Sequence, residues 1–229
     1  MGSVADRITE VRRSIAAAAV RSGRDPATIT LIAVGKTHPP ERVAEAVRAG
    51  ATDLGENRVQ EAAAKRPGVP AATWHLIGPL QRNKAATALE TFDVIHTIDR
   101  IELADRLELL LERDWPGRRQ RVLVEVNVGD EPQKAGVLPD EAAELVVAVA
   151  ERPRLELVGL MAIPPFEDDP EASRPHFRAL RELRDRLRDQ TALDLAQLSM
   201  GMSHDYEVAI EEGATMVRVG TAIFGPRET

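Results

Sequence analysis

The sequence has 229 residues and contains no cysteine. This absence excludes disulfide bonds, thiolate nucleophiles and zinc sites built from thiolates, and it suits a reducing cytoplasm. No apolar run reaches the roughly 18 residues that a membrane span needs. The amino terminus carries Asp6, Arg7 and Glu10 among its apolar residues, so it lacks the continuous apolar core of a signal peptide. We therefore expect a cytoplasmic protein that is not inserted in a membrane.

Motifs for two common classes of site are also absent. The five histidines show no H-E-x-x-H or similar spacing, so no metal site is expected. No G-x-G-x-x-G follows the first predicted strand, which disfavours a dinucleotide site. The formal net charge is −7, so the chain has no overall attraction to nucleic acid or to an anionic membrane. A small-molecule partner is favoured.

The strongest pattern that is present is an alternation of short β-branched apolar runs with longer amphipathic ones. Such alternation is typical of parallel βα units. The predicted strands are residues 29–34, 52–54, 73–77, 94–97, 121–127, 155–161, 193–198 and 215–219. The predicted helices between them are residues 41–49, 58–65, 84–90, 101–113, 139–151, 170–188 and 204–212.

Eight βα repeats without an obvious linker predict an α/β fold in which residues 1–229 form a single domain, a closed (β/α)₈ TIM barrel. The alternative is an open doubly wound sheet, for which the dinucleotide motif is missing. An extra helix over residues 4–21 precedes the first strand and ends before Gly23 and Pro26. We expect this helix to cover the lower end of the barrel.

Three segments that end at predicted strands carry polar and small residues suited to one site. They are Ala33-Val34-Gly35-Lys36-Thr37, Ser199-Met200-Gly201-Met202-Ser203 and Met216-Val217-Arg218-Val219-Gly220-Thr221. In a (β/α)₈ barrel functional groups gather at the carboxyl ends of the strands, and the loops after strands seven and eight often hold phosphate. A lysine facing glycines, hydroxyls and an arginine suits a phosphate-bearing aldehyde, which we interpret as pyridoxal 5′-phosphate.

Lys36 is the predicted site of covalent attachment. Among apolar neighbours its ammonium should be partly desolvated, which lowers its pKa and frees the amine for Schiff-base formation. The alternative is a solvated lysine or one paired with Glu56. Lys134 is most simply a rim lysine paired with acids, and a second aldehyde or phosphate contact there is the other hypothesis.

The phosphate is predicted to lie beside the last two strands. Gly220 and Thr221 precede a short apolar helix, so their backbone N–H groups and the threonine hydroxyl can point at a dianion. Ser199 and the Met200–Gly201 backbone can do the same from strand seven. Ser203 is interpreted as the N-cap of the following helix, and Ser199 as the phosphate ligand.

Three further polar residues lie in or next to predicted strands. Arg218 can hydrogen-bond a pyridine nitrogen at the barrel mouth, and its alternative is an ion pair with an acid on a neighbouring strand. Asn57 can bond the ring hydroxyl or a phosphate oxygen, cap the next helix, or do both. His75 is either a proton-transfer group or a satisfied interior polar residue, and the interior role is favoured.

In this order the motifs resemble those of the pyridoxal phosphate homeostasis protein family, whose barrel is similar to the N-terminal domain of alanine racemase. The resemblance spans nearly the whole chain. It rests on the segments Ala33–Thr37, Gly55–Glu61, Trp74–Gln81, His96–Asp99, Gly159–Met161, Leu198–Asp205 and Arg218–Gly225. It implies that Lys36 is the Schiff-base lysine, that Arg218 faces the pyridine nitrogen, that Asn57 lines the ring, and that Ser199, Gly220 and Thr221 bind phosphate.

The resemblance also implies a role in binding and supplying the cofactor, with apo-enzymes that use it as possible recipients and little or no catalytic turnover. Racemases of this fold use a second acid–base group from an additional domain and a partner subunit, which we do not expect here. The only tyrosine, Tyr206, lies in a predicted helix. We expect a monomer. One alternative is a pyridoxal-phosphate-dependent racemase or decarboxylase that uses Lys36 with His75 or a rim residue. Another is a phosphosugar aldolase or isomerase that uses a Schiff-base lysine at the same barrel mouth without a cofactor.

Overall fold

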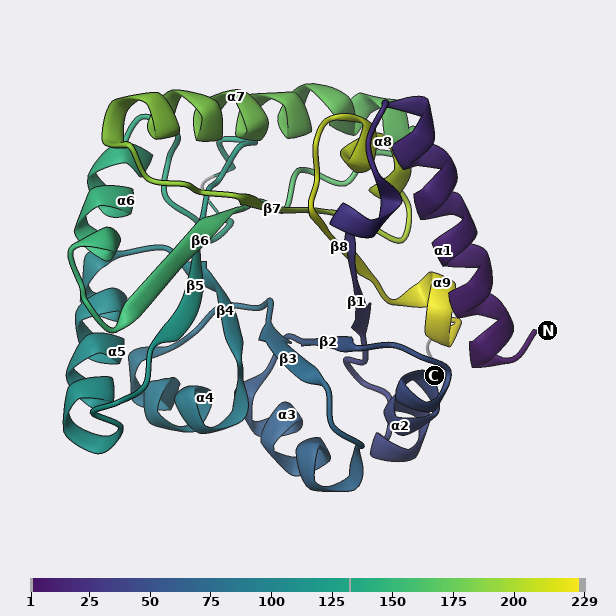
Figure 1. Cartoon of the computed structure of the whole chain (residues 1–229), viewed down its shortest axis with the longest axis horizontal. Coiled ribbons are helices and arrows are strands. Elements are labelled where there is room, and N and C mark those ends of the chain that lie inside the picture. The colour runs from purple at the N-terminus through teal and green to yellow at the C-terminus, as the bar shows by residue number, and fades with distance from the viewer. Residues whose placement is uncertain (1, 132, 227–229) are drawn as a thin grey trace.

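The computed structural model describes residues 2–131 and 133–226, and shows a ring of strands surrounded by helices (Figure 1). The single-domain prediction for residues 1–229 also includes Met1, Pro132 and residues 227–229, which lie outside the described residues. The strands are β1 (Thr30–Val34), β2 (Asp53–Glu56), β3 (Thr73–Leu76), β4 (Val94–Ile98), β5 (Gln120–Glu125), β6 (Leu155–Met161), β7 (Gln197–Met202) and β8 (Met216–Val219).

The strands form a closed barrel in chain order. Every neighbouring pair is parallel, and β1 closes the ring by pairing with both β2 and β8. The closed parallel barrel predicted from the βα alternation is confirmed. Because all strands run the same way, all their carboxyl ends meet at one end of the barrel.

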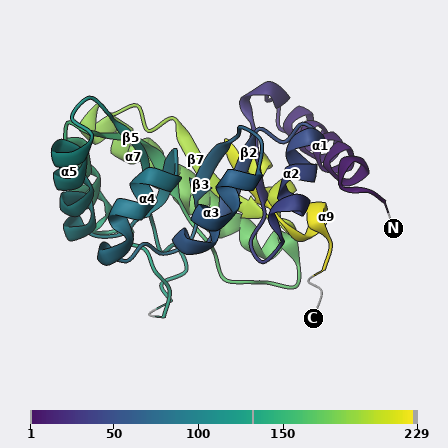
Figure 2. The same cartoon turned by 90° about the horizontal axis from the view of Figure 1, so that it is seen from below.

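The helices follow the strands around the outside of the ring, and Figure 2 shows α2, α3 and α4 covering one side of it. Their bounds are α1 (Val4–Arg21), α2 (Pro40–Arg48), α3 (Val59–Lys65), α4 (Ala85–Thr91), α5 (Ile101–Asp114), α6 (Ala142–Ala150), α7 (Arg174–Thr191), α8 (Tyr206–Glu211) and α9 (Thr221–Phe224). None of the helices in the described ranges is long and apolar enough to cross a membrane.

Helix α1 has the predicted bounds but not the predicted place. Ser3 and Asp6 form a capping box at its start, and its buried face includes Val4, Ile8 and Val11. That face packs against the outer helices α8, α9 and α2, so the expectation that it covers the lower end of the barrel is wrong. Because α9 is only four residues long, α1 takes the place in the outer ring between α8 and α2 (Figure 1).

Strand β7 begins four residues later than predicted, since residues 193–198 were expected and Gln197–Met202 is observed. Helix α7 continues to Thr191, and Ala192 and Leu195 then adopt positive φ angles of 57° and 39°. This left-handed backbone breaks the extended run of Leu193 and Leu195. The shift moves Ser199 into the strand and leaves Ser203 just past its end.

The apolar core has two parts. The large part lies between the sheet and the helices and includes strand residues such as Trp74, Ile95 and Val217. A small cluster of Val94, Leu123 and Met161 is separate from it. Since successive strand residues face opposite sides, the neighbours of the outward apolar residues point into the barrel. Polar side chains take several of these inward places.

Candidate functional site

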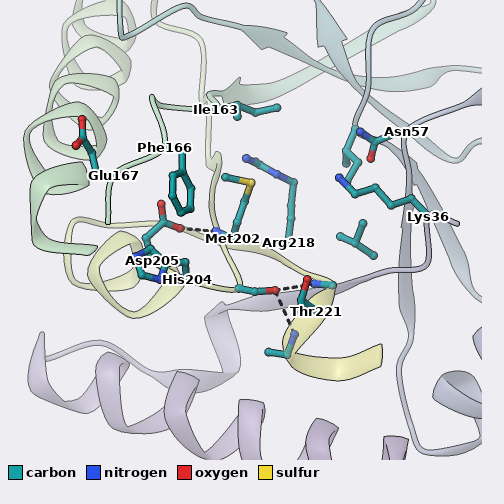
Figure 3. A pocket seen from close by; sticks show the side chains of 15 residues that line it. Lys36, Asn57, Ile163, Phe166, Glu167, Met202, His204, Asp205, Arg218 and Thr221 are labelled. Carbon is teal, nitrogen blue, oxygen red and sulfur yellow. Dashed lines mark hydrogen bonds between the residues drawn. The ribbon is translucent and has the colours of Figure 1, made fainter. Parts of the chain in front are cut away.

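A cavity of about 700 Å³ opens at the carboxyl ends of the strands. Lys36 and Asn57 lie on one side of it, Phe166 and Met202 lie on the other, and Arg218 lies between them (Figure 3). The residues that line the cavity are Val34, Lys36, Asn57, Ile77, Ile163, Phe166, Glu167, Met202, Ser203, His204, Asp205, Arg218, Gly220, Thr221 and Ala222. The structure therefore brings together five of the predicted site residues: Lys36, Asn57, Arg218, Gly220 and Thr221.

Lys36 lies in a tight turn directly after β1. A side chain on Gly35 would place its Cβ 2.8 Å from Val43 Cγ2, so the preceding position has no room for one. Thr37 has a φ of 69°, an uncommon conformation for a β-branched residue. The turn is therefore held in a shape that the sequence does not favour locally, and the surrounding structure must supply the energy that maintains it.

Three buried or partly buried charged residues hold this turn, and we call them the lysine clamp: Lys65, Glu56 and Glu61. Lys65 Nζ donates to the Gly35 carbonyl at 2.8 Å, to Glu56 Oε1 at 2.8 Å and to Glu61 Oε1 at 2.6 Å. Glu61 Oε1 also accepts from the Thr37 backbone N–H at 2.6 Å. The clamp thus forms hydrogen bonds to the backbone on both sides of Lys36, at the Gly35 carbonyl and the Thr37 N–H.

The clamp carboxyls have opposite pKa shifts. Burial raises the pKa of Glu56 to about 7, although the Lys65 contact and the more distant Lys36 charge oppose this. Burial also acts on Glu61, but bonds from Lys65 and the Thr37 N–H outweigh it and leave that pKa below its ordinary value. The ion pair recorded for Glu56 is with Lys65. The predicted lowering of the Lys36 pKa stays a prediction.

Ser203 lies in the cavity and does not cap the helix that follows it, so its predicted role is wrong. Helix α8 begins at Tyr206 with Asp205 as its N-cap residue. The Ser203 hydroxyl instead accepts from the backbone N–H groups of Gly220 at 3.0 Å and Ala222 at 3.4 Å. These amides therefore converge on an oxygen at the start of α9 (Figure 3).

The placement of Ser199, Met200 and Gly201 differs from the prediction, because none of them is among the described residues that line the cavity. Ser199 is fully buried inside the barrel. Met200 belongs to the core between sheet and helices. Gly201 has a φ of 90°, and a Cβ there would come within 2.6 Å of the Ala209 Cβ. The later start of β7 explains all three.

Arg218 lines the cavity from β8 and is 3% exposed. Its Nη1 donates to Ser199 Oγ at 2.7 Å and its Nη2 donates to the Ala162 carbonyl at 2.9 Å. Its partners are thus neutral oxygens, and the alternative of an ion pair with a neighbouring strand is not what the structure records. Burial lowers the pKa of Arg218 to about 10, which still leaves it charged at neutral pH.

Asn57 follows β2 and has an open hydrogen-bonding position. Helix α3 begins at Val59 with Arg58 as its N-cap residue, so Asn57 does not cap it. The Asn57 Oδ1 atom is buried and has no hydrogen-bond partner among the described residues. A buried unpaired acceptor is costly, so a ligand that donates to Oδ1 would be favoured here.

His75 and Lys134 do not reach the cavity, as far as the described residues show. His75 is 1% exposed and is hydrogen-bonded through both ring nitrogens, which is the favoured interior role. Lys134 pairs with Glu131 and donates to the Pro164 carbonyl at 3.0 Å. This agrees with the simpler interpretation, a rim lysine paired with an acid.

The wall of the cavity opposite Lys36 was not predicted from the sequence. Phe166, in the loop after β6, has 74% of its surface exposed and packs against His204 with ring centroids 5.6 Å apart. The His204 Nε2 atom lies 3.0 Å from the Asp168 carbonyl. The sequence did mark this wall: an aromatic residue follows Pro164 and Pro165 in the long loop after β6, at the carboxyl end of that strand.

The cavity fits a phosphorylated aldehyde with a pyridine ring. It offers an amine on Lys36, a fixed positive charge on Arg218, converging amides at Gly220 and Ala222, and the unpaired acceptor Asn57 Oδ1. An arrangement of this kind can hold a dianion at one end and react with a carbonyl at the other. Among the described residues, no group of three or more His, Cys, Asp or Glu side chains could hold a metal ion.

Comparison with known proteins agrees with this geometry. The sequence model of the protein family 'alanine racemase, N-terminal domain' matches residues 13–228 of this chain. The pyridoxal phosphate homeostasis protein of Escherichia coli strain K12 is 45% identical, over 100% of this chain and 98% of its own length. The pyridoxal phosphate homeostasis protein of Aquifex aeolicus is 44% identical, over 97% of this chain and 98% of its own length.

A solved structure, PipY of Synechococcus elongatus with pyridoxal phosphate bound, superposes with a TM-score of 0.85 at 36% identity, covering 97% of this chain and 100% of that one. Barrel, cavity and sequence similarity lead to the same conclusion: this chain belongs to the pyridoxal phosphate homeostasis protein family, built on the fold of the alanine racemase N-terminal domain.

Proposed function

We propose that the chain binds pyridoxal 5′-phosphate as a Schiff base on Lys36 and serves the supply and balance of this cofactor inside the cell. One observation carries the proposal: a single cavity is lined by Lys36 from the turn after β1, by Arg218 from β8 and by residues at the start of α9 whose amides converge on one oxygen. The PipY structure, which has this cofactor bound, supports it by similarity. The Lys36 amine would replace the carbonyl oxygen of the cofactor's aldehyde, and that oxygen would leave as water.

Each residue of the cavity has a role in this proposal. The Gly220 and Ala222 amides and the Thr221 hydroxyl hold the phosphate, because the two N–H groups now bonded to Ser203 already converge on one oxygen, which a phosphate oxygen would replace. Arg218 faces the pyridine nitrogen and its charge keeps that nitrogen unprotonated. Asn57 Oδ1 accepts a hydrogen bond from the ring hydroxyl.

The same geometry favours binding over turnover. His75, the residue considered for a second proton-transfer step, is hydrogen-bonded inside the barrel below the cavity. Proton transfer from the lysine side alone would give at most slow, unspecific exchange. The relatives are named for homeostasis of the cofactor and not for a reaction. We infer a cytoplasmic monomer that passes cofactor to apo-enzymes.

Absorbance spectroscopy with borohydride trapping tests the proposal. Purified protein incubated with pyridoxal phosphate should show a visible band that borohydride removes, and mass spectrometry should locate a phosphopyridoxyl group on Lys36. Lys36→Ala should lose the adduct, whereas Lys84→Ala, outside the cavity, should keep it. No band in the wild-type protein would overturn the proposal.

Turnover assays separate a binding protein from an enzyme. Incubating the loaded protein with a panel of amino acids should give no saturable racemisation or decarboxylation. Saturable turnover that is lost in Lys36→Ala would instead establish the racemase or decarboxylase alternative.

A further inference from the structure

A continuous line of hydrogen bonds runs through the barrel interior beneath Arg218. We call its members, Asp53, His75, His96 and Ser199, the histidine chain. Asp53 Oδ1 lies 2.9 Å from His75 Nε2, His75 Nδ1 lies 2.8 Å from His96 Nε2, and His96 Nδ1 lies 2.9 Å from Ser199 Oγ. Ser199 Oγ then accepts from Arg218 Nη1 at 2.7 Å. Residues from β2, β3, β4, β7 and β8 take part.

The chemistry of the two ends decides where each proton lies. The Asp53 carboxylate only accepts, so His75 Nε2 carries a hydrogen, and a neutral His75 ring then has Nδ1 as an acceptor. His96 must then donate from Nε2 and accept at Nδ1. Ser199 therefore donates its hydroxyl hydrogen to His96 and has a lone pair free for Arg218. Every donor meets an acceptor along the line.

The reverse order fails at the lower end. If neutral His96 carried its proton on Nδ1, it would donate to Ser199, and His75 would have to donate from Nδ1. His75 Nε2 would then present a lone pair to the Asp53 carboxylate across 2.9 Å. Two acceptors at that distance repel each other, so Asp53 sets the direction of the whole chain.

Because the chain is buried, a change in this proton order would leave buried polar groups without partners and would cost free energy. His75 is 1% exposed, and His96 and Ser199 are fully buried. Burial, followed by the neighbouring His75 and the Arg218 charge, holds the pKa of His96 well below its usual range. Burial also raises the pKa of Asp53, but bonds from His75 and Thr52 outweigh it and leave that carboxyl below its ordinary value. A neutral His96 between an ionised Asp53 and a charged Arg218 matches the proton assignment.

The chain joins the two ends of the barrel. Arg218 lines the large cavity. Asp53 lines a separate cavity of about 440 Å³ with Thr52, Leu31 and Arg12, where β1 and β2 begin. A substitution at Asp53 therefore leaves the residues that line the large cavity unchanged.

We propose that Asp53, His75, His96 and Ser199 are positioning residues that hold Arg218 Nη1 on Ser199 by a single ordered set of protons. They thereby direct the guanidinium N–H groups that are bonded neither to Ser199 nor to the Ala162 carbonyl to the ring of the cofactor. The inference rests on the proposed function, because Arg218 is taken to face the pyridine nitrogen. The chain itself can be tested in protein that holds no cofactor.

The first test is nitrogen-15 NMR of the histidine rings in the cofactor-free wild-type protein at neutral pH. His75 and His96 should both show neutral rings with the hydrogen on Nε2. An Nδ1–H tautomer or an imidazolium signal for either histidine would overturn the proposal. Since this measurement needs no variant and no cofactor, it decides the proton order even if pyridoxal phosphate does not bind.

The second test measures cofactor affinity and absorbance in variants. Ser199→Ala should raise the Kd for pyridoxal phosphate about tenfold, because Arg218 loses a buried partner. Asp53→Ala should raise it about threefold, shift the cofactor absorbance and populate the Nδ1–H tautomer of His96. Asp93→Ala is the matched control, since Asp93 accepts from the Trp74 N–H and lies outside the chain.

The outcomes separate the two proposals. A wild-type protein that does not bind pyridoxal phosphate contradicts the proposed function. A wild-type protein that binds it, together with an Asp53→Ala variant whose His96 tautomer and cofactor spectrum are unchanged or match those of Asp93→Ala, contradicts the positioning role of the chain.

Discussion

The lysine clamp beneath Lys36 and the histidine chain beneath Arg218 both support the proposed cofactor cavity, but they do so with different chemistry. The clamp gathers charge: Lys65 contacts both Glu56 and Glu61 within 2.8 Å. In the proposed chain, Asp53 and Arg218 are the charged ends, and His75, His96 and Ser199 connect them. The clamp bonds to backbone groups, whereas the chain bonds to a side chain.

The difference follows from what each network has to hold. The turn at Gly35–Thr37 is a strained backbone, and charged groups bond strongly to carbonyl and amide dipoles. Arg218 already carries a charge, so a charged partner would compete with a ligand for it. A neutral chain fixes the direction of the guanidinium and leaves its charge available to the cavity. Changes to the lysine clamp should therefore lower the stability of the turn, whereas changes to the histidine chain should alter the orientation of Arg218.

The largest effect is expected for Lys65→Met. The substitution keeps the aliphatic stem but leaves Glu56 and Glu61 in a buried site without their cation. We expect the free energy of unfolding to fall by about 3 kcal/mol and Schiff-base formation to weaken, measured by urea unfolding and by absorbance. Lys84→Met is the control and should change stability by less than about 0.5 kcal/mol. Equal stability of the two variants would show that the clamp does not support the turn.

The next largest effect is a pH dependence of stability that comes from Glu125. This residue lies near enough to Arg218 to feel its charge, and its Oε2 atom is buried and has no hydrogen-bond partner among the described residues. Burial and the Asp99 charge raise its pKa from 4.5 to about 7, while Arg218 opposes this. Because the folded pKa is the higher one, the stability that Glu125 contributes is fully present below about pH 4.5 and is lost as the pH rises through about 7. The loss is roughly 3 kcal/mol.

Glu125→Gln should therefore make the free energy of unfolding less dependent on pH between 5 and 8 and should stabilise the protein at pH 8. Urea unfolding at several pH values measures this. Glu56, whose pKa is raised to the same value, should keep part of the slope in this variant. An unchanged slope would place the titration elsewhere.

A smaller effect is expected for Ser203→Ala. Without the hydroxyl, the Gly220 and Ala222 amides lose their acceptor, and the cofactor-free protein should lose about 1 kcal/mol of stability. A bound phosphate would supply a new acceptor, so added pyridoxal phosphate should raise the melting temperature of the variant more than that of the wild type. Ser22→Ala, in a hydroxyl bond to the end of α1, is the control. An equal rise in melting temperature in Ser203→Ala and in the wild type would argue against phosphate at these amides.

The smallest effect is expected for Thr37→Gly. Glycine adopts a φ of 69° without the cost that a β-branched side chain carries, although it gains entropy in the unfolded chain. We expect a stability gain of about 0.5 kcal/mol in thermal unfolding, with the clamp bond to the residue 37 N–H retained. A loss of stability would show that the threonine side chain has a role that outweighs the strain.

The sequence alone predicted the eight strands, the closed barrel and the place of Lys36, because βα alternation is a local, periodic signal and each strand end is marked by small or polar residues. Lys36, Asn57, Arg218, Gly220 and Thr221 follow or lie in such strands, and all of them reach one cavity. The parallel direction of the strands alone requires this convergence.

Tertiary structure decided the rest. A four-residue shift of β7 follows from an α7 that ends at Thr191 instead of residue 188 and from left-handed backbone at Ala192 and Leu195, and it leaves Ser199 outside the cavity and Ser203 inside it. The bond between His96 and Ser199 joins residues 103 positions apart, and no local pattern marks it. Propensity and periodicity act over a few neighbouring residues, whereas the place of a helix such as α1 and the course of a buried hydrogen-bond chain depend on barrel closure, which brings distant strands into contact.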